Sequence, residues 1–498
     1  MPPCRVHASR SHPIRSRRGT ASLRLDELTA GIASGALSGV EITAITADSR
    51  KAGPGTLFAA LPGAKFDGRQ FIGAAIAAGA AAILAPEGTA RPEGAPLLTA
   101  ADPRAALARM AARLAGPQPE IAVAITGTNG KTSTADFLRQ IWGAGLSASI
   151  GTLGILAPGF ETGPGLTTPD PVMLQDTLAA LARAGIGRVA MEASSHGLDQ
   201  RRLDGVAVSA AGFTNLTRDH LDYHGTMAAY RAAKLRLFDT LLPEGGPGAY
   251  STEMDGETRE ALLAIAARRG LKLLSVGAEA GDIALLAADP LPDGLALTLD
   301  WFGAREVLHL PLPGRFQADN ALLAAALAVQ TGTPARDALA ALPYLLGVRG
   351  RMELVASVNG GAAYVDFAHT PDALERLLVA LRPHCSGRLI CAFGAGGDRD
   401  PGKRPLMGGI VAARADIAIV TDDNPRSEDP ALIRQAIMAE VPDAIEIGDR
   451  HAAIAHGLLL LQPGDVLVVA GKGHESGQTV RGVTTPFDDA QVIREILS

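Results

Sequence analysis

Residues 121–133 read IAVAITGTNGKTS and give the clearest indication of the fold of this chain. Its apolar part predicts a strand, its glycine-containing part a loop, and the following STADFLRQIWG a helix. A glycine loop between strand and helix lets backbone N–H groups surround phosphate oxygens, with positive potential from the helix N-terminus. Lys131 adds a charge, and Thr132 a hydroxyl for Mg²⁺. We therefore predict a phosphate-binding loop made of Gly127, Thr128, Asn129, Gly130, Lys131, Thr132 and Ser133.

One position departs from the general phosphate-loop pattern. That pattern places a glycine five positions before Gly130, and Ile125 stands there in this chain. We interpret the loop as a shortened variant. A glycine turn that caps an ordinary helix is the alternative, but the coincidence of strand, Gly-Lys-Thr and helix favours the phosphate site.

Strand and helix patterns alternate on both sides of this loop. Residues 71–85 predict a helix leading into a strand, and residues 103–116 predict a helix with Asp102 as its cap. Such alternation indicates an α/β fold with open, mostly parallel sheets, which bind ligands at the carboxyl ends of their strands. The other predicted strands lie within residues 42–50, 55–63, 188–195, 415–423 and 465–473.

The length indicates several domains. At about 150 residues per domain, 498 residues correspond to roughly three. We predict three α/β units in series, joined near residues 100 and 346. The predicted divisions are a disordered extension over residues 1–20 and domains over 21–101, 102–346 and 347–498.

The composition excludes several classes of protein. Hydrophobic residues make up 47% and charged residues 20%, which is typical of a folded globular protein. The net charge of −6 gives no general attraction to nucleic acid or anionic lipid, and no apolar run reaches the roughly 20 residues that cross a bilayer. Cys4, Cys385 and Cys391 cannot form a disulfide framework or a four-cysteine zinc site. We expect a reduced, cytoplasmic protein that neither binds nucleic acid nor inserts into a membrane.

The first twenty residues differ in composition from the rest of the chain. They are rich in Arg and Ser, lack acids, and have no apolar core of the kind a secretory signal requires. They loosely resemble an organelle transit peptide, whereas a disordered extension or an overcalled start codon is the favoured interpretation. We exclude them from the fold.

Two stretches carry candidate metal ligands. Glu192 follows an apolar strand and would lie beside the phosphate loop, although a strand-end Glu is more often solvated. Asp219, His220, Asp222 and His224 lie within six positions of one another. Two His four apart could bind zinc on a helix, but hard oxygen ligands beside a nucleotide site favour Mg²⁺, with one His assisting.

Several motifs of this sequence resemble those of a known protein family. TGTNGKTS, MEASSHGL, FTNLTRDHLDYHG and AAKLRLF resemble those of the Mur ligase family, which builds the peptide stem of peptidoglycan. GDRDPGKRP, DDNPRSEDP and AGKGHE resemble those of the member that adds a diamino acid to UDP-N-acetylmuramoyl-L-alanyl-D-glutamate. The resemblance runs from about Leu25 to the C-terminus. It implies a UDP-binding N-terminal α/β domain, a central P-loop-type ATPase domain and a Rossmann-like C-terminal domain.

The resemblance assigns ligands to particular positions. Leu166 replaces a polar neighbour of the threonine pair found in some relatives, which puts one hydrogen bond in doubt. The positions that match contacts to the UDP-linked muropeptide are Ala47, Ser49, Ala64, Lys65, Phe66, Thr167, Thr168, Ser194, Gln200 and Arg202. Asn320, Arg351 and Asp366 match positions around ATP, in addition to the loop. Taken alone, Asn320 would be a helix cap and Arg351 a surface charge.

Lys234 also matches a family position. Taken alone it would be a solvated lysine on a helix, but relatives carry the matching lysine as a carbamate formed with CO₂ (N6-carboxylysine). A carbamate replaces a cation that would repel Mg²⁺ with an anionic oxygen ligand. The resemblance implies two Mg²⁺ ions, one served by Thr132 and Glu192 and one by His220 and carbamylated Lys234. The catalytic residues that it implies are Lys131, Glu192, His220 and Lys234.

The third domain is expected to select the amino acid. Meso-diaminopimelate differs from lysine by a carboxylate at its far stereocentre, and a bidentate Arg is the best partner for that group. Asp423-Asn424-Pro425-Arg426 matches the family's diaminopimelate motif, and Arg426 supplies the cation. The supporting positions are Arg399 for the carboxylate and Gly471 and Glu475 for the ammonium.

The function implied by the resemblance is an ATP-dependent amide ligase that works through an acyl phosphate. Its partners would be ATP, UDP-N-acetylmuramoyl-L-Ala-D-Glu and meso-diaminopimelate, and we expect a monomer. A lysine-adding relative and a folylpolyglutamate synthase are the near alternatives. The Asp-Asn-Pro-Arg motif argues against the first, and the UDP-type N-terminal domain against the second. The more distant alternative is a nucleotide-binding regulator that has lost catalysis.

Overall fold

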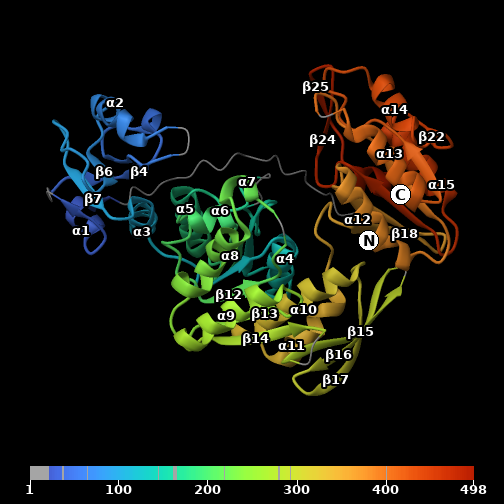
Figure 1. Cartoon of the computed structure of the whole chain (residues 1–498), viewed down its shortest axis with the longest axis horizontal. Coiled ribbons are helices and arrows are strands. Elements are labelled where there is room, and N and C mark those ends of the chain that lie inside the picture. The colour runs from blue at the N-terminus through green and yellow to red at the C-terminus, as the bar shows by residue number, and fades with distance from the viewer. Residues whose placement is uncertain are drawn as a thin grey trace, which may run out of the picture. The chain divides into compact units, whose positions relative to one another are not determined.

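The computed structural model describes residues 22–35, 39–63, 66–143, 145–160, 165–217, 219–278, 281–291, 293–399 and 401–498 (Figure 1). They form two compact units. The first consists of residues up to Gln118 with Asp170–Arg183 and Gln200–Val206. The second consists of Pro119–Pro169, Ala184–Asp199 and Ala207–Ser498.

The first unit is built on a five-stranded sheet. Its strand order is β2-β7-β6-β5-β4, parallel except for β2, and a short antiparallel pair β1-β3 accompanies it. The strands are β1 (Leu23–Arg24), β2 (Ser34–Gly35), β3 (Glu41–Ile42), β4 (Ala44–Thr46), β5 (Thr56–Ala59), β6 (Ala82–Pro86) and β7 (Leu97–Ala100). The helices are α1 (Leu25–Thr29), α2 (Ile72–Ala77), α3 (Pro103–Ala115) and α5 (Pro171–Arg183). The predicted cap of α3 is confirmed, because the Asp102 carboxylate accepts the N–H groups of Arg104 and Ala105.

The second unit contains a ten-stranded sheet of order β10-β9-β11-β8-β12-β13-β14-β15-β16-β17. Its strands are parallel from β9 to β15 and antiparallel at both ends. The strands are β8 (Ile121–Thr126), β9 (Ser147–Gly151), β10 (Gly154–Leu156), β11 (Arg188–Glu192), β12 (Ala210–Phe213), β13 (Pro247–Ser251), β14 (Lys272–Gly277), β15 (Ile283–Leu291), β16 (Gly294–Trp301) and β17 (Ala304–Leu310). The strand before the phosphate loop, β8, therefore lies between β11 and β12.

A six-stranded sheet of order β18-β19-β23-β20-β21-β22 follows in the same unit, parallel except for β18. Its strands are β18 (Glu353–Val358), β19 (Gly361–Asp366), β20 (Leu389–Phe393), β21 (Ile417–Val420), β22 (Ile445–Glu446) and β23 (Val466–Ala470), with a separate hairpin of β24 (Gly477–Val480) and β25 (Val483–Pro486). These α/β sheets confirm the predicted fold class and each of the predicted strands. Among the described residues, no helix has the length and apolarity needed to traverse a membrane.

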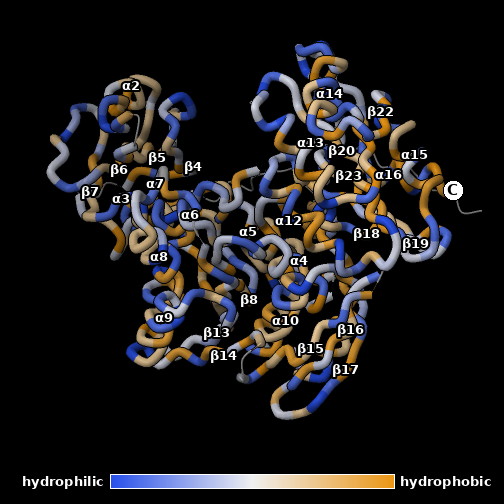
Figure 2. The backbone as a smooth tube through the Cα atoms, turned by 45° about the vertical axis from the view of Figure 1, so that its right-hand side comes forward, coloured by the Kyte–Doolittle hydropathy of each residue, from blue (hydrophilic) through white to orange (hydrophobic). Residues whose placement is uncertain are grey.

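Helices cover these two sheets. They are α4 (Lys131–Trp142), α6 (Ser195–Asp199), α7 (Leu221–His224), α8 (Met227–Arg236), the π-helix η3 (Leu237–Leu241), α9 (Gly256–Arg269), α10 (Arg315–Gln330), α11 (Ala335–Ala341), α12 (Pro371–Leu381), α13 (Lys403–Arg414), α14 (Pro430–Met438), α15 (Arg450–Leu460) and α16 (Asp489–Leu497). Helices α4 and α10 pack against each other and against the ten-stranded sheet. Apolar stretches follow α10 and the central strands of both sheets (Figure 2), and these side chains are buried.

One acidic side chain on α10 lacks a full set of hydrogen bonds in the part of the chain that the structure describes. Asp319 is largely buried, and its Oδ1 atom has no hydrogen-bond partner among the described residues. Burial raises the pKa of its carboxyl to about 6, with nearby Glu253 acting in the same direction and Arg315 opposing both. The folded protein therefore binds a proton at this carboxyl more tightly than the unfolded chain does.

Replacing Asp319 with Asn should stabilise the protein at neutral pH. Because the folded-state pKa is raised above the ordinary value of 3.8, the contribution of Asp319 is fully present below about pH 4 and is lost as the pH rises through 6. Asn stays neutral throughout. Thermal melts of the parent and Asp319→Asn should agree near pH 4, and the variant should melt several degrees higher at pH 7.5. Equal melting temperatures at pH 7.5 would contradict this account.

Candidate active site

The phosphate loop needs its glycines for steric reasons. Gly127 and Gly130 have φ values of 143° and 85°. A Cβ at Gly127 would collide with the Thr214 hydroxyl, and one at Gly130 with the Asn320 amide. Both positions therefore require glycine, in conformation and in space.

Hydrogen bonds from the end of β12 hold the loop. Asn215 accepts the N–H of Thr128 at its backbone oxygen (2.8 Å) and the N–H of Asn129 at Oδ1 (3.0 Å). The Thr214 hydroxyl donates to the backbone oxygen of Asn129 (2.6 Å). The loop is thus fixed by the strand next to its own.

Lys131 is held against the loop that precedes it. Its Nζ donates to the backbone oxygens of Gly127 (3.0 Å) and Thr128 (2.8 Å). Burial lowers the pKa of this lysine, whereas Glu192 and Asp219 act in the opposite direction. A cation at this place can neutralise phosphate oxygens that the loop binds.

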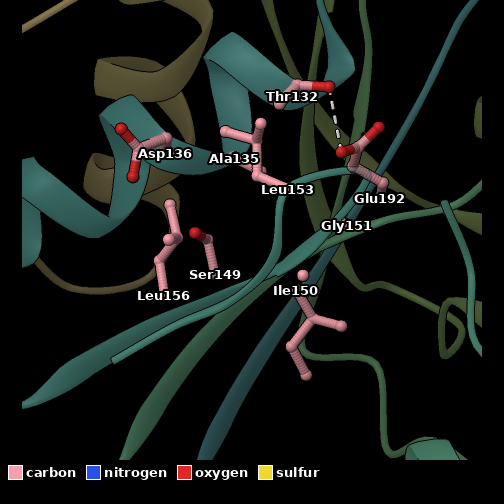
Figure 3. Close-up of a pocket in the computed structure, with 10 residues that line it drawn as sticks. Thr132, Ala135, Asp136, Ser149, Ile150, Gly151, Leu153, Leu156 and Glu192 are labelled. Atoms are coloured by element: carbon pink, nitrogen blue, oxygen red, sulfur yellow. Dashed lines mark hydrogen bonds between the residues drawn. The ribbon is translucent and has the colours of Figure 1, made fainter. Parts of the chain in front are cut away.

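Glu192 lies at the carboxyl end of β11, beside the helix that follows the loop (Figure 3). It is only 2% exposed, so the solvated alternative for this strand-end Glu is wrong. Its Oε1 accepts the Thr132 hydroxyl (2.9 Å) and the N–H of Thr152 (2.7 Å), and its Oε2 accepts the Thr152 hydroxyl (3.3 Å). Burial raises the pKa of this carboxyl, and the nearby Lys131 opposes that shift. The paired oxygens of Thr132 and Glu192 are the hard donors that Mg²⁺ prefers.

Lys234 is brought to the same loop by α8. Its side chain is 1% exposed, so the solvated-lysine alternative is wrong as well. Its Nζ donates to the Gly127 backbone oxygen (2.6 Å) and lies 4.5 Å from the centre of the Tyr230 ring. Burial, assisted by the charge of Lys131, lowers the pKa of Lys234 to about 6.

His220 belongs to a group of aromatic rings. Its ring centre is 4.9 Å from that of His196, which in turn lies 4.0 Å from Tyr223 and 5.5 Å from His224. Sequence reasoning missed His196 and Tyr223, although both lie within the quoted motifs. Among the residues that the structure describes, no three His, Cys, Asp or Glu side chains form a metal-binding cluster. A metal here would need the hydroxyl of Thr132 and other donors.

Three of the predicted muropeptide residues come together beside Glu192. The Thr168 hydroxyl donates to the Glu192 backbone oxygen (2.8 Å), lies 3.0 Å from the Ser194 hydroxyl and accepts the N–H of Ser194. The Thr167 hydroxyl lies 3.2 Å from that of Thr152, which ties it to the same carboxylate. These hydroxyls therefore form one polar group with the candidate metal ligands.

The other predicted muropeptide residues that the structure describes lie in the first unit. Ala47 follows β4, Ser49 begins a short 3₁₀ turn, and Phe66 is 68% exposed. The Arg202 guanidinium donates to Gln200 Oε1 (2.7 Å). The predicted Ala64 and Lys65 lie outside the described residues.

The predicted ATP residues lie in two places. Asn320 is buried inside α10 against Gly130, so the interpretation as a helix cap is wrong: its amide donates to Gln317 (3.2 Å) within the helix. Arg351 and Asp366 lie instead at the six-stranded sheet, where the Arg351 guanidinium covers the Phe367 ring at 5.0 Å. Burial raises the pKa of the Asp366 carboxyl, which accepts two backbone N–H groups.

The predicted diaminopimelate residues gather at the carboxyl ends of β20, β21 and β23. The Asn424 amide donates to Glu475 (2.8 Å), and Arg426 donates to the Gly397 backbone oxygen (2.7 Å) from a left-handed conformation. Arg399 is exposed in the loop after β20. Asp423 and Gly471 complete this group, and Pro425 gives its turn. Sequence reasoning missed Lys472, which lies at its centre.

The fold and the glycine loop are those of a nucleotide-phosphate-binding α/β protein, in which Thr132 and Glu192 are candidate ligands of a divalent cation. Three family models match it in order: Mur ligase family, catalytic domain (residues 41–115), Mur ligase middle domain (125–328) and Mur ligase, glutamate ligase domain (350–473). Together they cover most of the chain, and the chain belongs to the Mur ligase family.

Relatives agree with this assignment. The chain is 55% identical over 457 residues to a UDP-N-acetylmuramoyl-L-alanyl-D-glutamate–2,6-diaminopimelate ligase of Caulobacter vibrioides, covering 90% of this chain and 94% of the relative. It is 51% identical to the protein of that name from Agrobacterium fabrum, covering 93% and 94%. A solved structure of that name is 32% identical, with a TM-score of 0.75 and coverage of 96% and 99%. The ADP complex of MurF from Thermotoga maritima is 19% identical, covers 91% and 96%, and shares the fold with a TM-score of 0.55.

Replacing Gly151 with Ala should disturb the candidate metal site without touching a ligand. An added Cβ would collide with the Glu192 carboxylate, so the carboxylate must move. Loss of ligand orientation typically costs about tenfold or more in metal affinity. Mn²⁺ binding, followed by electron paramagnetic resonance, should weaken by that factor.

Gly145→Ala is the matched control, because an added Cβ there meets open space. Unchanged Mn²⁺ affinity in Gly151→Ala, with the control also unchanged, would show that Glu192 does not hold the metal.

Proposed function

We propose that this chain is an ATP-dependent ligase that joins meso-diaminopimelate to UDP-N-acetylmuramoyl-L-alanyl-D-glutamate, a step of peptidoglycan precursor synthesis. The observation that carries the proposal is that Arg426 and Glu475 lie on the segments after β21 and β23, which the hydrogen bond from Asn424 to Glu475 joins, so that this edge of the sheet carries both a cation and an anion. The names of the relatives that are about 50% identical support the same reaction. The proposed domains are 21–101 for the UDP-muropeptide, 102–346 for ATP and 347–498 for the amino acid.

The proposed reaction has two steps. The side-chain carboxylate of the D-Glu residue attacks the γ-phosphorus of ATP in line, which forms an acyl phosphate and releases ADP. The amine of diaminopimelate then attacks the acyl carbon, loses a proton, and expels inorganic phosphate to leave the amide. Lys131 and the loop N–H groups neutralise the phosphate oxygens during the first step. Water must be excluded, because it would hydrolyse the acyl phosphate.

We assign two Mg²⁺ positions to this site. Thr132 and Glu192 would hold one, because their oxygens already lie 2.9 Å apart. His220 and a carbamate on Lys234 would hold the other. Bound there, the ions would supply positive charge to the phosphate oxygens.

Carbamylation of Lys234 is chemically reasonable. Only the neutral amine attacks CO₂, and a pKa of about 6 leaves most of this amine neutral at pH 7 and above. The nitrogen of the neutral amine bonds to the carbon of CO₂ and releases one proton, which leaves an anionic oxygen donor in place of the amine. Lys131 would stabilise that anion.

The substrates fix the remaining proposals. UDP-linked precursors and ATP indicate a cytoplasmic reaction, and one chain carries residues for all three substrates, so we propose a monomer. We assign UDP-muropeptide binding to the family-matched positions of the first unit and to the three hydroxyls of Thr167, Thr168 and Ser194.

Phosphate release should depend on all the proposed substrates. With ATP, Mg²⁺ and UDP-N-acetylmuramoyl-L-Ala-D-Glu, we expect strong turnover with meso-diaminopimelate and little with L-lysine. Arg426→Ala should lower kcat/KM for diaminopimelate on the order of 100-fold, because a charged, bidentate partner is lost. A preference for L-lysine would overturn the proposed specificity for diaminopimelate but would still agree with the proposed ligase reaction. No turnover with either would overturn the proposed reaction.

Carbamylation of Lys234 can be observed directly. In ¹³C-bicarbonate at pH 8, the protein should show a carbamate resonance that is absent from Lys234→Ala and present in Lys272→Ala, a variant of an exposed lysine. No such difference between the two variants would refute the carbamate.

A further inference from the structure

A buried ammonium lies at the centre of the amino-acid cluster. Lys472 follows β23, and its side chain is fully inaccessible to solvent. A fully buried lysine is rare unless its charge is paired. Its Nζ donates to Asn424 Oδ1 (3.2 Å) and to the Gly477 backbone oxygen (2.8 Å). This nitrogen therefore joins the Asp-Asn-Pro-Arg turn to the β24–β25 hairpin.

Two carboxylates face the same ammonium. Lys472 Nζ lies 3.7 Å from Asp423 and 3.8 Å from Glu475. Burial lowers the pKa of Lys472, and Asp423 opposes this shift. Arg450 is the other buried cation nearby, and it is satisfied by Asp489 through two bonds of 2.8 and 2.7 Å. Asp423 and Glu475 also help to raise the pKa of Arg450, but the ion-pair distances described for these two carboxylates are to Lys472.

The contacts of Lys472 fix the orientation of one amide. Asn424 Oδ1 accepts both Lys472 Nζ and the N–H of Thr479 (2.9 Å). With its oxygen held by two donors, the amide turns its NH₂ group toward Glu475, to which it donates at 2.8 Å. A rotated amide would point an oxygen at the Glu475 carboxylate and an NH₂ at two donors.

We propose that Lys472 is a positioning residue that fixes the orientation of the Asn424 amide and the position of the Glu475 carboxylate. Through these two groups it determines the preference for an amino acid that carries both an ammonium and a carboxylate at its far end. This inference rests on the proposed function, since Asn424, Arg426 and Glu475 are taken as the diaminopimelate site. Lys472 is buried and does not touch the substrate. It acts by holding the Asn424 NH₂ group on Glu475 and by balancing the negative charge of Asp423 and Glu475.

The consequence is a difference between two amino acids. Without the Lys472 ammonium, Asn424 Oδ1 loses one of its two donors, and the Asp423 and Glu475 carboxylates lose the counter-charge they face. The amide can then rotate, and the unbalanced negative charge repels a substrate carboxylate. Diaminopimelate carries the carboxylate that would be repelled, whereas L-lysine lacks it. Loss of Lys472 should therefore harm diaminopimelate more than L-lysine.

The test compares the ratio of kcat/KM for meso-diaminopimelate to that for L-lysine in the full-length protein. Lys472→Met should lower this ratio tenfold or more, on the order expected for hydrogen bonds to a charged group. The KM values for ATP and the UDP-muropeptide should stay within twofold. Hydroxylamine, supplied in place of the amino acid, should still trap the acyl phosphate as a hydroxamate.

Arg388→Met is the matched control. Arg388 pairs with the buried Asp465 in the same sheet, at the opposite ends of the strands (2.6 Å). It should lower the melting temperature and leave the ratio unchanged. If Lys472→Met lowers the melting temperature to the same extent and leaves the ratio within twofold, Lys472 has a structural role only and the inference is overturned.

A second variant keeps the test decisive if Lys472→Met does not fold. In Asn424→Asp the side chain keeps almost the same shape, but an oxygen replaces the NH₂ group that faces Glu475. This variant should therefore lose the preference for diaminopimelate in the same way. In a folded double variant the two effects on the ratio should not add, because they act through one amide. An unchanged ratio in Asn424→Asp would overturn the inference. Failure of the parent protein to use diaminopimelate would instead overturn the proposed function.

Discussion

The parallel pairing of β8 with β11 and β12 is the constraint on which the phosphate site depends. In this register Ile125 lies opposite Glu192, and Thr126 opposite Phe213. The carboxyl ends of all three strands therefore meet at one edge of the sheet, as in other open α/β sheets. The loop, the acidic side chain and the residues that hold the loop come from segments far apart in the chain, and only this pairing brings them together.

That edge concentrates charge in a place with little water. The Gly127 backbone oxygen accepts both Lys131 (3.0 Å) and Lys234 (2.6 Å), so two lysines share one acceptor. Burial is the main reason why the pKa of Lys234 falls, and the nearby charge of Lys131 lowers it further. Buried Glu192 has a raised pKa in the same region. Clustered charged groups with shifted pKa values are enriched at functional sites.

Most of the fold could be predicted from sequence, because its signals are local. The alternation of apolar strands and helices, the cap at Asp102 and the glycine loop depend only on neighbouring residues. Burial of Glu192 and Lys234 could not be predicted that way, since it depends on which strands pair and where α8 packs. Asn320 shows the same limit: its residue type favours a cap, but packing against Gly130 places it within α10. Without the family resemblance, Lys234 would have been taken for a surface charge, and Glu192 would have been only a weak candidate for a metal ligand.

The cluster around Asn424 and Lys472 also depends on how strands are ordered in a sheet, with one added requirement. The segments after β21 and β23 carry Asn424 and Lys472, but β20 lies between these strands. They can meet only if the segment after β20 leaves room, and it does so with glycine. A Cβ at Gly394 would collide with the Thr421 backbone oxygen, and one at Gly397 with the backbone oxygen of Pro425. The glycines of this loop therefore determine whether a charged cluster can form across an intervening strand, just as Gly127 and Gly130 determine whether the phosphate loop can close.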